Sequence, residues 1–232
     1  GIGSSAMSGV MTAATVGTVG IGYTALNALT EGAGNIAIGY QAMLTHTTGS
    51  RNLAIGHQAM MDTDHHADVL GSTDNIFIGY QSGAGTWETN DSNFNVAVGN
   101  YTMDANSMNG ALNNTAVGYG SLGALTEGDY NTVLGGLAGD AINTGSNNVM
   151  LGYSAGTHNV STSDGIKNVL IGSYSDTSAA DGENQIAIGY DCSGQADNTV
   201  TLGNDDVTDL YAASDGAAEV HCGTLAVGLG TG

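Results

Sequence analysis

Proline is absent from the 232-residue chain, and its 38 glycines show no period of three. A collagen triple helix needs both features, so that architecture is excluded. Basic residues are almost missing as well, because Arg51 and Lys167 stand against 22 acidic residues and leave a net charge of −20. Nucleic-acid backbones and anionic membrane surfaces are bound by clustered Lys and Arg. We therefore expect no nucleic-acid partner and no attraction to such a membrane surface.

Long apolar runs are also lacking, so we expect no membrane insertion. The chain begins GIGSSAMSGV, without an initiator Met or a basic n-region, as expected of a fragment or a processed product. Its two cysteines, Cys192 and Cys222, have no CxxC pattern, and a disulfide and two free thiols remain equally open. Hydrophobic residues nevertheless make up 41% of the chain, which favours a packed fold over disorder.

What the sequence does contain is a repeat. The pentad Asn, apolar, any, apolar, Gly occurs as NIAIG, NLAIG, NIFIG, NVAVG, NTAVG, NTVLG, NVMLG and NVLIG, with degenerate copies TVGIG, QIAIG and TVTLG. The copies are most often 17 residues apart, a period too short for a helical pair or a propeller blade. Their closing glycines are Gly22, Gly39, Gly56, Gly79, Gly99, Gly118, Gly135, Gly152, Gly172, Gly189 and Gly203. This pattern predicts an all-β fold, a parallel β-roll or β-solenoid of about eleven short coils.

Each repeat is expected to form one coil made of a strand, a tight turn, a second strand and a loop. The pentad supplies the first strand, with Ile36 and Ile38 on one face and Ala37 on the other, and segments such as YQAM supply the second. Val, Ile and Leu are expected to form a thin core. A second face, rich in Ala, Met and Gly, would then be covered by other copies in a parallel homotrimer. All 22 acids lie outside the pentads, as expected if charge is confined to loops.

Three positions of the repeat have distinct expected roles. The closing Gly permits a positive φ at a sharp corner, so a side chain at Gly118 or Gly152 is expected to destabilise the coil, and one at loop residue Gly85 to matter less. The opening Asn is expected to form a hydrogen-bonded ladder from coil to coil. A Tyr follows the Gly in six coils and is expected to form a partial aromatic file along one edge (Tyr23, Tyr40, Tyr80, Tyr119, Tyr153 and Tyr190).

The iterated N(V/I)AIGYxA pattern resembles the head repeats of trimeric autotransporter adhesins and, more closely, repeats of phage tail fibres and host-attachment proteins. Residues 198–204, NTVTLGN, match the segment that closes such arrays, and the resemblance covers about residues 18–225. It implies a left-handed parallel β-roll assembled as a homotrimer. The longer period and the lack of an anchor or chaperone segment favour an excised fibre segment over a complete autotransporter. We divide the chain into a lead-in (1–17), a repeat domain (18–204) and a β-rich connector (205–232).

The longest insertion, MDTDHHADVLGSTD, is a candidate metal site between the third and fourth coils. Asp62, Asp64 and Asp68 offer oxygen ligands within seven residues, and His65 and His66 offer imidazoles. Oxygen ligands suit a divalent cation such as calcium. A solvated acidic loop is the alternative interpretation.

The next insertion, GAGTWETNDSNFN, is a candidate receptor-binding loop. It contains Trp87, Glu88 and Phe94, and an aromatic side chain in a surface loop suits stacking on a sugar ring. A loop folded over its own aromatics is the alternative. His65 and His66 are also candidates for receptor contact, whereas no local spacing assembles a catalytic constellation.

The sequence therefore predicts an extracellular, structural and adhesive role. The chain is expected to be a segment of a trimeric fibre, in a virion tail fibre or similar surface appendage, that presents loops to a host cell-surface receptor, with a glycan as the expected receptor. A bacterial surface adhesin head and a fibre-borne polysaccharide-degrading enzyme are the alternatives.

Overall fold

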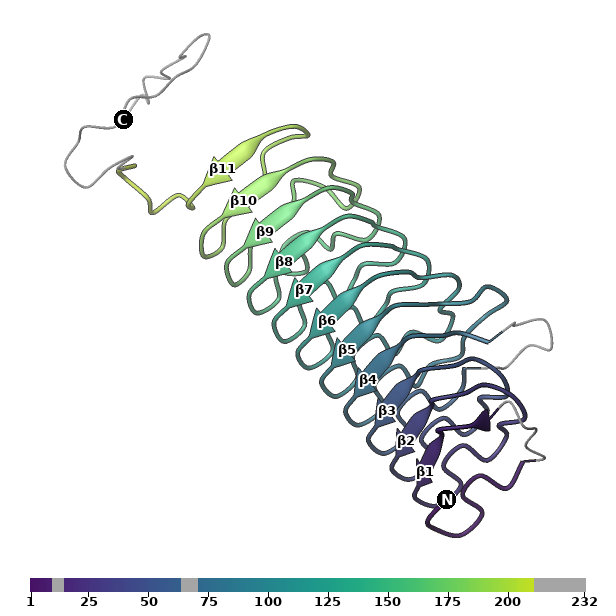
Figure 1. Cartoon of the computed structure of the whole chain (residues 1–232). Helices are drawn as coiled ribbons and strands as arrows, with labels where there is room; N and C mark the ends of the chain where they lie inside the picture. Colours follow the sequence, from purple (N-terminus) through teal and green to yellow (C-terminus); the bar gives the residue numbers. More distant parts are fainter. Residues whose placement is uncertain (10–14, 64–70, 211–232) are drawn as a thin grey trace.

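The computed structural model describes residues 1–9, 15–63 and 71–210. These residues form one parallel sheet of eleven strands in sequential order, with one strand in each coil, stacked into an elongated solenoid (Figure 1). The strands are β1 (Val19–Ile21), β2 (Ile36–Ile38), β3 (Leu53–Ile55), β4 (Ile76–Ile78), β5 (Val96–Val98), β6 (Thr115–Val117), β7 (Thr132–Leu134), β8 (Val149–Leu151), β9 (Val169–Ile171), β10 (Ile186–Ile188) and β11 (Val200–Leu202). The predicted all-β parallel solenoid is confirmed. Coils are numbered below by their strands.

The segment after each corner glycine is not a second strand. Gln41 and Met43 have φ values of 55° and 52°, in the left-handed region that a β-strand does not use. The backbone is still hydrogen-bonded between coils, because the Gln41 N–H donates to the Tyr23 carbonyl at 2.9 Å and the Met43 N–H to the Ala59 carbonyl at 3.0 Å. The expected second strand is therefore wrong, and coil-to-coil bonds hold a left-handed turn in its place.

The inner and outer faces of the strands are the reverse of those expected. Ala37, at the centre of β2, is fully buried inside the coil, whereas Ile36 and Ile38 point outward and are only partly buried. The same order holds along the sheet, so the core consists of the middle residues of the strands together with turn residues such as Met43. The coil is too narrow to enclose two branched side chains from each strand. The branched residues therefore remain to be covered from outside.

Each coil fills its interior by pairing a large residue with a small one. In coil 2 the strand centre is Ala37, and the turn contributes the buried Met43. In coil 4 the strand centre is Phe77, and the equivalent turn position is Gly83, where an added Cβ would lie 2.4 Å from the Phe77 ring. The total volume is thus kept nearly constant, which is the kind of exchange that packed cores tolerate.

The predicted asparagine ladder is present at the opening of the strands. In coil 8, the backbone N–H and the Nδ2 of Asn148 each donate to Oδ1 of Asn131 at 3.0 Å, and Nδ2 also donates to the Gly165 carbonyl at 2.8 Å. The same pattern joins the buried residues Asn35, Asn52, Asn75, Asn95, Asn114, Asn131, Asn148 and Asn168. The ladder fixes the register of successive coils while leaving its buried amides hydrogen-bonded.

The eleven closing glycines all have positive φ, from 85° at Gly203 to 149° at Gly135, which confirms their predicted role as corners. The expectation that loop residue Gly85 is more tolerant is wrong. A Cβ added at Gly85 would lie 1.9 Å from the Ala105 carbonyl oxygen, because this insertion stacks closely on the coil that follows. Gly85 therefore cannot serve as a tolerant reference position.

Part of the predicted lead-in adds to the solenoid. Ile2 forms a parallel bridge with Ile21, and its backbone N–H donates to the Gly20 carbonyl at 2.8 Å. Gly3 has a φ of 126°, as the corner glycines do, and Met7 packs against the core. Residues 1–9 thus cover the lower edge of β1.

Candidate functional site

The outward side of the sheet carries two straight files of mostly aliphatic side chains. The opening file consists of the first strand residues, Val19, Ile36, Leu53, Ile76, Val96, Thr115, Thr132, Val149, Val169, Ile186 and Val200. The closing file consists of the third strand residues, Ile21, Ile38, Ile55, Ile78, Val98, Val117, Leu134, Leu151, Ile171, Ile188 and Leu202. In-register pairing keeps both files continuous over eleven coils. A continuous apolar surface of this length is typical of an interaction site.

A third row, the aromatic file, lies just beyond the corner glycines. It contains Tyr23, Tyr40, His57, Tyr80, Tyr101, Tyr119, Tyr153, Tyr174 and Tyr190, whose contacting rings have centroids 4.7 to 5.7 Å apart. The predicted partial file is confirmed, and His57, Tyr101 and Tyr174 extend it. The rings from Tyr23 to Tyr80 are stacked, with interplanar angles of 15° to 27°, whereas the later contacts are edge to face, at 73° to 89°.

The aromatic file is interrupted in coil 7, where Gly136 follows the corner glycine. In the described part of the chain no ring contact joins Tyr119 to Tyr153, and these side chains are 58% and 48% exposed, against 39% for Tyr80 within the continuous stretch. A Cβ added at Gly136 would meet nothing closer than the Tyr153 ring at 3.6 Å. Gly136 thus leaves an opening in the aromatic file.

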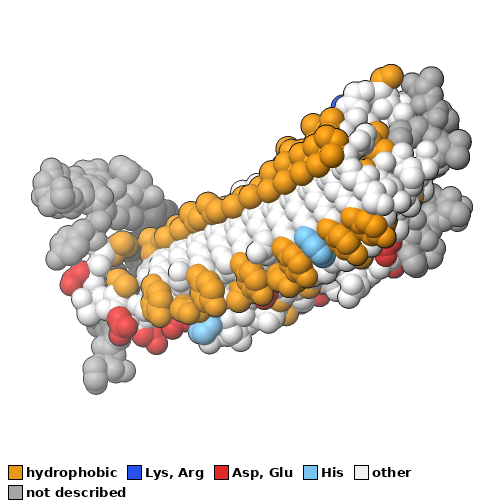
Figure 2. All heavy atoms as spheres, turned by 90° about the horizontal axis from the view of Figure 1, so that it is seen from below, with side chains coloured by type: hydrophobic (Ala, Val, Ile, Leu, Met, Phe, Trp, Pro, Cys, Tyr) orange, Lys and Arg blue, Asp and Glu red, His pale blue; other side chains and the backbone are white. Residues whose placement is uncertain are grey.

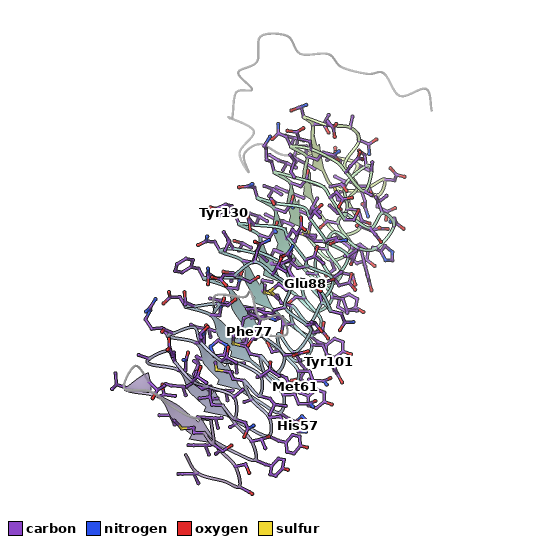
Figure 3. All side chains as sticks on the ribbon, turned by 90° about the vertical axis from the view of Figure 1, so that its right-hand side faces the viewer. His57, Met61, Phe77, Glu88, Tyr101 and Tyr130 are labelled. Atoms are coloured by element: carbon purple, nitrogen blue, oxygen red, sulfur yellow. The ribbon has the colours of Figure 1, made fainter. Side chains whose placement is uncertain are left out.

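The edge on the other side of the sheet is formed by the residue before each ladder position, and we call it the entry edge. It consists of Gly34, Arg51, Asp74, Phe94, Asn113, Tyr130, Asn147, Lys167, Asn184 and Asn198, all of which have positive φ. Most of these are polar, but Phe94 and Tyr130 are 53% and 56% exposed. Figure 3 shows Tyr130 on the side of the solenoid opposite to His57 and Tyr101.

These rows follow one another across the outward face of the sheet and its two edges, in the order in which the chain forms them: entry edge, opening file, closing file and aromatic file. Figure 2 shows two long hydrophobic rows side by side, separated by a band of backbone and polar groups. The row that includes histidine is the aromatic file, since His57 stacks between Tyr40 and Tyr80. Apolar surface therefore extends along the whole described solenoid.

Trp87 does not present its ring to a ligand. It is buried in the core, its indole Nε1 donates to the Gly83 carbonyl at 3.2 Å, and its ring lies 5.6 Å from that of Phe77. The predicted receptor contact through Trp87 is wrong, because the insertion folds back over its own aromatic side chain. Glu88 is partly buried and its backbone N–H donates to the Met108 carbonyl at 2.7 Å, whereas Phe94 is exposed on the entry edge.

The predicted metal site is described only at its first ligand. Asp62 accepts hydrogen bonds from the Thr45 hydroxyl at 3.3 Å and the Thr86 hydroxyl at 3.4 Å. The other candidates, Asp64, His65, His66 and Asp68, lie outside the described residues. Within residues 1–9, 15–63 and 71–210, no group of three His, Cys, Asp or Glu side chains is placed to hold a metal ion.

An open depression of about 500 Å³ lies beside the last two coils. Its lining includes the carboxylates of Asp191, Asp205 and Asp206 and no basic residue. Cys192, close by in the chain, is buried, and burial raises the pKa of its thiol. The sequence left open whether Cys192 and Cys222 form a disulfide or are two free thiols, and Cys222 lies outside the described residues.

The electrostatics of the solenoid are dominated by carboxylates. Burial raises the pKa of Asp104, Asp140 and Asp176 above the ordinary value of 3.8, because desolvation disfavours the charged form. The Arg51 guanidinium donates two hydrogen bonds to Asp74, at 2.6 and 2.7 Å, and lowers the pKa of that carboxyl. This second effect is weakened by solvent, because the pair lies at the surface.

Stability is accordingly expected to fall as the pH rises from about 4, the ordinary value of a carboxyl group, to about 7 at low ionic strength. A carboxyl whose folded-state pKa is raised contributes stability that is complete below its unfolded value and is lost as the pH rises through the folded value. Mutual repulsion among 22 acids acts in the same direction. Urea unfolding followed by circular dichroism at both pH values, with and without added salt, measures this change. A midpoint that rises with pH at low salt would contradict it.

None of the family models, curated proteins or solved structures compared with the chain matches it. In the described residues no helix has both the length and the apolar character needed to cross a bilayer.

Proposed function

We propose that this chain is the rod-like scaffold of an extracellular trimeric fibre, a virion tail fibre or a similar surface appendage, which holds receptor-binding loops at fixed spacing. The observation that carries the proposal is the outward apolar surface formed by the opening and closing files. Eleven strands at about 4.8 Å spacing make each file about 50 Å long. A free monomer would leave this whole surface in water.

The dimensions favour self-association that uses more than the two files. A strip about 50 Å long and three residues, or about 10 Å, wide has an area of about 500 Å². A standard stable interface buries about 800 Å² on each partner. The aromatic file beside the strip supplies further apolar area. Closed cyclic symmetry with parallel solenoid axes would cover these rows along their whole length.

The charge distribution is compatible with packing against identical copies. Although the chain has a net charge of −20, the entry edge and the three files include a single acid, Asp74, which is paired with Arg51. The other basic residue on this surface, Lys167, is paired with Glu183 at 2.5 Å. Identical copies could therefore meet here without opposing uncompensated carboxylates.

Recognition is assigned to the insertions, because the coils repeat one surface and loops carry most unique contacts. The candidates are His65, His66 and Glu88, with Asp62, Asp64 and Asp68 as ligands for a divalent cation such as calcium. A receptor glycan would be neutral or contain amino sugars, since an anionic one would be repelled by the net charge.

The test removes the longest insertion without disturbing the repeat. Gly56 and Gly79 are 23 residues apart, so deletion of residues 65–70 restores the common interval of 17. We expect the deletion variant to remain trimeric by light scattering, with an unchanged melting temperature, and to lose binding to an array of immobilised neutral and amino-sugar glycans. Glycan binding retained by the deletion variant would overturn the role of the insertion. A monomeric parent chain at micromolar concentration would overturn the proposed assembly.

A further inference from the structure

We infer that neighbouring copies interlock along each seam, with Tyr130 of one copy seated over Gly136 of the next. The aromatic file of each copy would then lie against the entry edge and the opening file of its neighbour. This inference rests on the trimer proposed above and names the surfaces that join its members.

Cyclic symmetry decides which edges meet. In a closed ring of three copies every contact is heterologous, so one edge of a copy meets the opposite edge of the next. The two edges of the outward face are chemically different: one is the aromatic file and the other is the entry edge with its exposed Tyr130 (Figure 3). If the sheets face the three-fold axis, the closing files converge toward that axis. Each aromatic file then reaches the neighbour's entry edge.

Cyclic symmetry also decides which coils meet. A pure rotation about an axis parallel to the solenoid includes no translation, so each coil faces the same coil of the next copy. Coil 7 has Gly136 on one edge and Tyr130 on the other. The opening in the aromatic file and the exposed ring on the entry edge are therefore brought to the same height.

Phe94, the other exposed aromatic residue of the entry edge, belongs to coil 5. There Asn100 follows the corner glycine, but Tyr101 contacts Tyr80 and Tyr119 and keeps the aromatic file continuous. Within the described solenoid, an exposed aromatic residue on the entry edge therefore coincides with an opening in the aromatic file in coil 7 alone.

The opening at Gly136 can receive a ring. A Cβ added there has no neighbour closer than 3.6 Å, and the rings of Tyr119 and Tyr153 on either side of the opening are both exposed. Beside Tyr130 the opening file has Thr132, which is smaller than the Leu, Ile or Val found in most other coils. A tyrosine seated there would gain aromatic contacts on two sides and bury an exposed side chain.

The experiment is a double-mutant cycle on the full chain with Tyr130→Asn and Gly136→Tyr. Neither change should disturb the fold, because Asn113 and Asn147 occupy the equivalent entry-edge position with φ of 59° and 61°, and Gly136 has space for a side chain. We expect each single variant to raise the dissociation constant of the trimer about tenfold or more, measured by sedimentation. Tyr130→Asn removes the ring, and Gly136→Tyr fills its seat.

The double variant is expected to recover most of the lost affinity, because the ring introduced at position 136 would occupy the space vacated at position 130. Asn147→Tyr is the matched control. It adds a ring to the entry edge one coil further on, opposite Tyr153, and is expected to weaken the trimer without rescue by Gly136→Tyr. A wild-type monomer would refute the assembly itself. A wild-type trimer in which the two changes are additive, or have no effect, would refute the seam and leave the assembly standing.

Discussion

Gly135→Ala is expected to lower the free energy of unfolding by roughly 3 to 5 kcal/mol, whereas Gly136→Ala should change it by less than about 0.5 kcal/mol. Gly135 has a φ of 149°, and an added Cβ would lie 2.1 Å from the carbonyl oxygen of Gly152 in the next coil. Backbone cannot move aside as a flexible side chain does, so coils 7 and 8 would have to separate.

Gly136 is a matched control because it is the adjacent residue and undergoes the same chemical change. The nearest atom to its added Cβ belongs to the Tyr153 ring at 3.6 Å, an ordinary contact distance. Urea unfolding of both variants at one pH and salt concentration, followed by circular dichroism, gives the comparison. Equal loss of stability in the two variants would show that the corner geometry is not what limits substitution.

The repeat itself was predictable because its determinants are local. A Gly at a positive-φ corner, an Asn that bonds to its counterpart, and a fixed interval each follow from backbone chemistry. The partial coil formed by residues 1–9, before coil 1, was missed because GIGSSAM lacks the Asn. Its Gly3 nevertheless has the corner φ of 126°, and Ile2 pairs with Ile21. The alignment of GIG with the later GIG at residues 20–22 was the available signal.

The two faces of the strand could not be assigned from alternation, because a period of two separates the faces without saying which one is inside. Hydrophobicity favours Ile36 and Ile38 over Ala37 for burial, yet the width of the coil decides otherwise. Coil 4 combines a large strand residue, Phe77, with Gly83, whereas coil 2 combines a small one, Ala37, with Met43. This compensation in size indicated that the middle residue of each strand points into the coil.

The candidate site was partly hidden for a related reason. The aromatic file was predictable from the Tyr that directly follows the corner glycine. Tyr101 and Tyr174 are the second residue after their corner glycines, and they belong to the file because their rings contact those of neighbouring coils. Trp87 was placed on the surface because its insertion is polar. Its burial depends on Phe77 and Gly83 of the same coil and on its pairing with Met108 of the next coil. Contacts of this kind depend on the stacking of coils and cannot be inferred from the composition of a single loop.

Asn148→Asp is expected to be among the most damaging single changes to the described solenoid, although it alters neither the size nor the shape of the side chain. The Nδ2 of Asn148 donates to Oδ1 of Asn131 at 3.0 Å and to the Gly165 carbonyl at 2.8 Å. A carboxylate would lose both donations and oppose two acceptors with a buried negative charge. The Gly165 carbonyl would lose its donor, at a cost of about 1 to 3 kcal/mol, whereas Oδ1 of Asn131 would keep the backbone N–H of Asn148 as a donor. Together with the uncompensated buried charge, we expect a loss of roughly 4 to 6 kcal/mol at neutral pH.

The neighbouring substitution Asn147→Asp is the control for the same chemical change. Asn147 is exposed on the entry edge with a φ of 61°, and Asp74 occupies the equivalent position in coil 4 with the same φ. We expect Asn147→Asp to alter the free energy of unfolding by less than about 0.5 kcal/mol. A large loss in this variant would mean that added charge alone, and not the broken ladder, destabilises the solenoid.

The pH dependence of Asn148→Asp separates the ladder from a general loss of packing. Burial would raise the folded-state pKa of the introduced carboxyl, so the folded state would bind its proton more tightly than the unfolded chain does. The damage should therefore be smaller at pH 5 than at pH 8, because a protonated carboxyl restores one donor to the ladder. Urea unfolding of both variants and the parent at the two pH values measures the difference. A loss that is the same at both pH values would show that the asparagine ladder is not held by its amide donors.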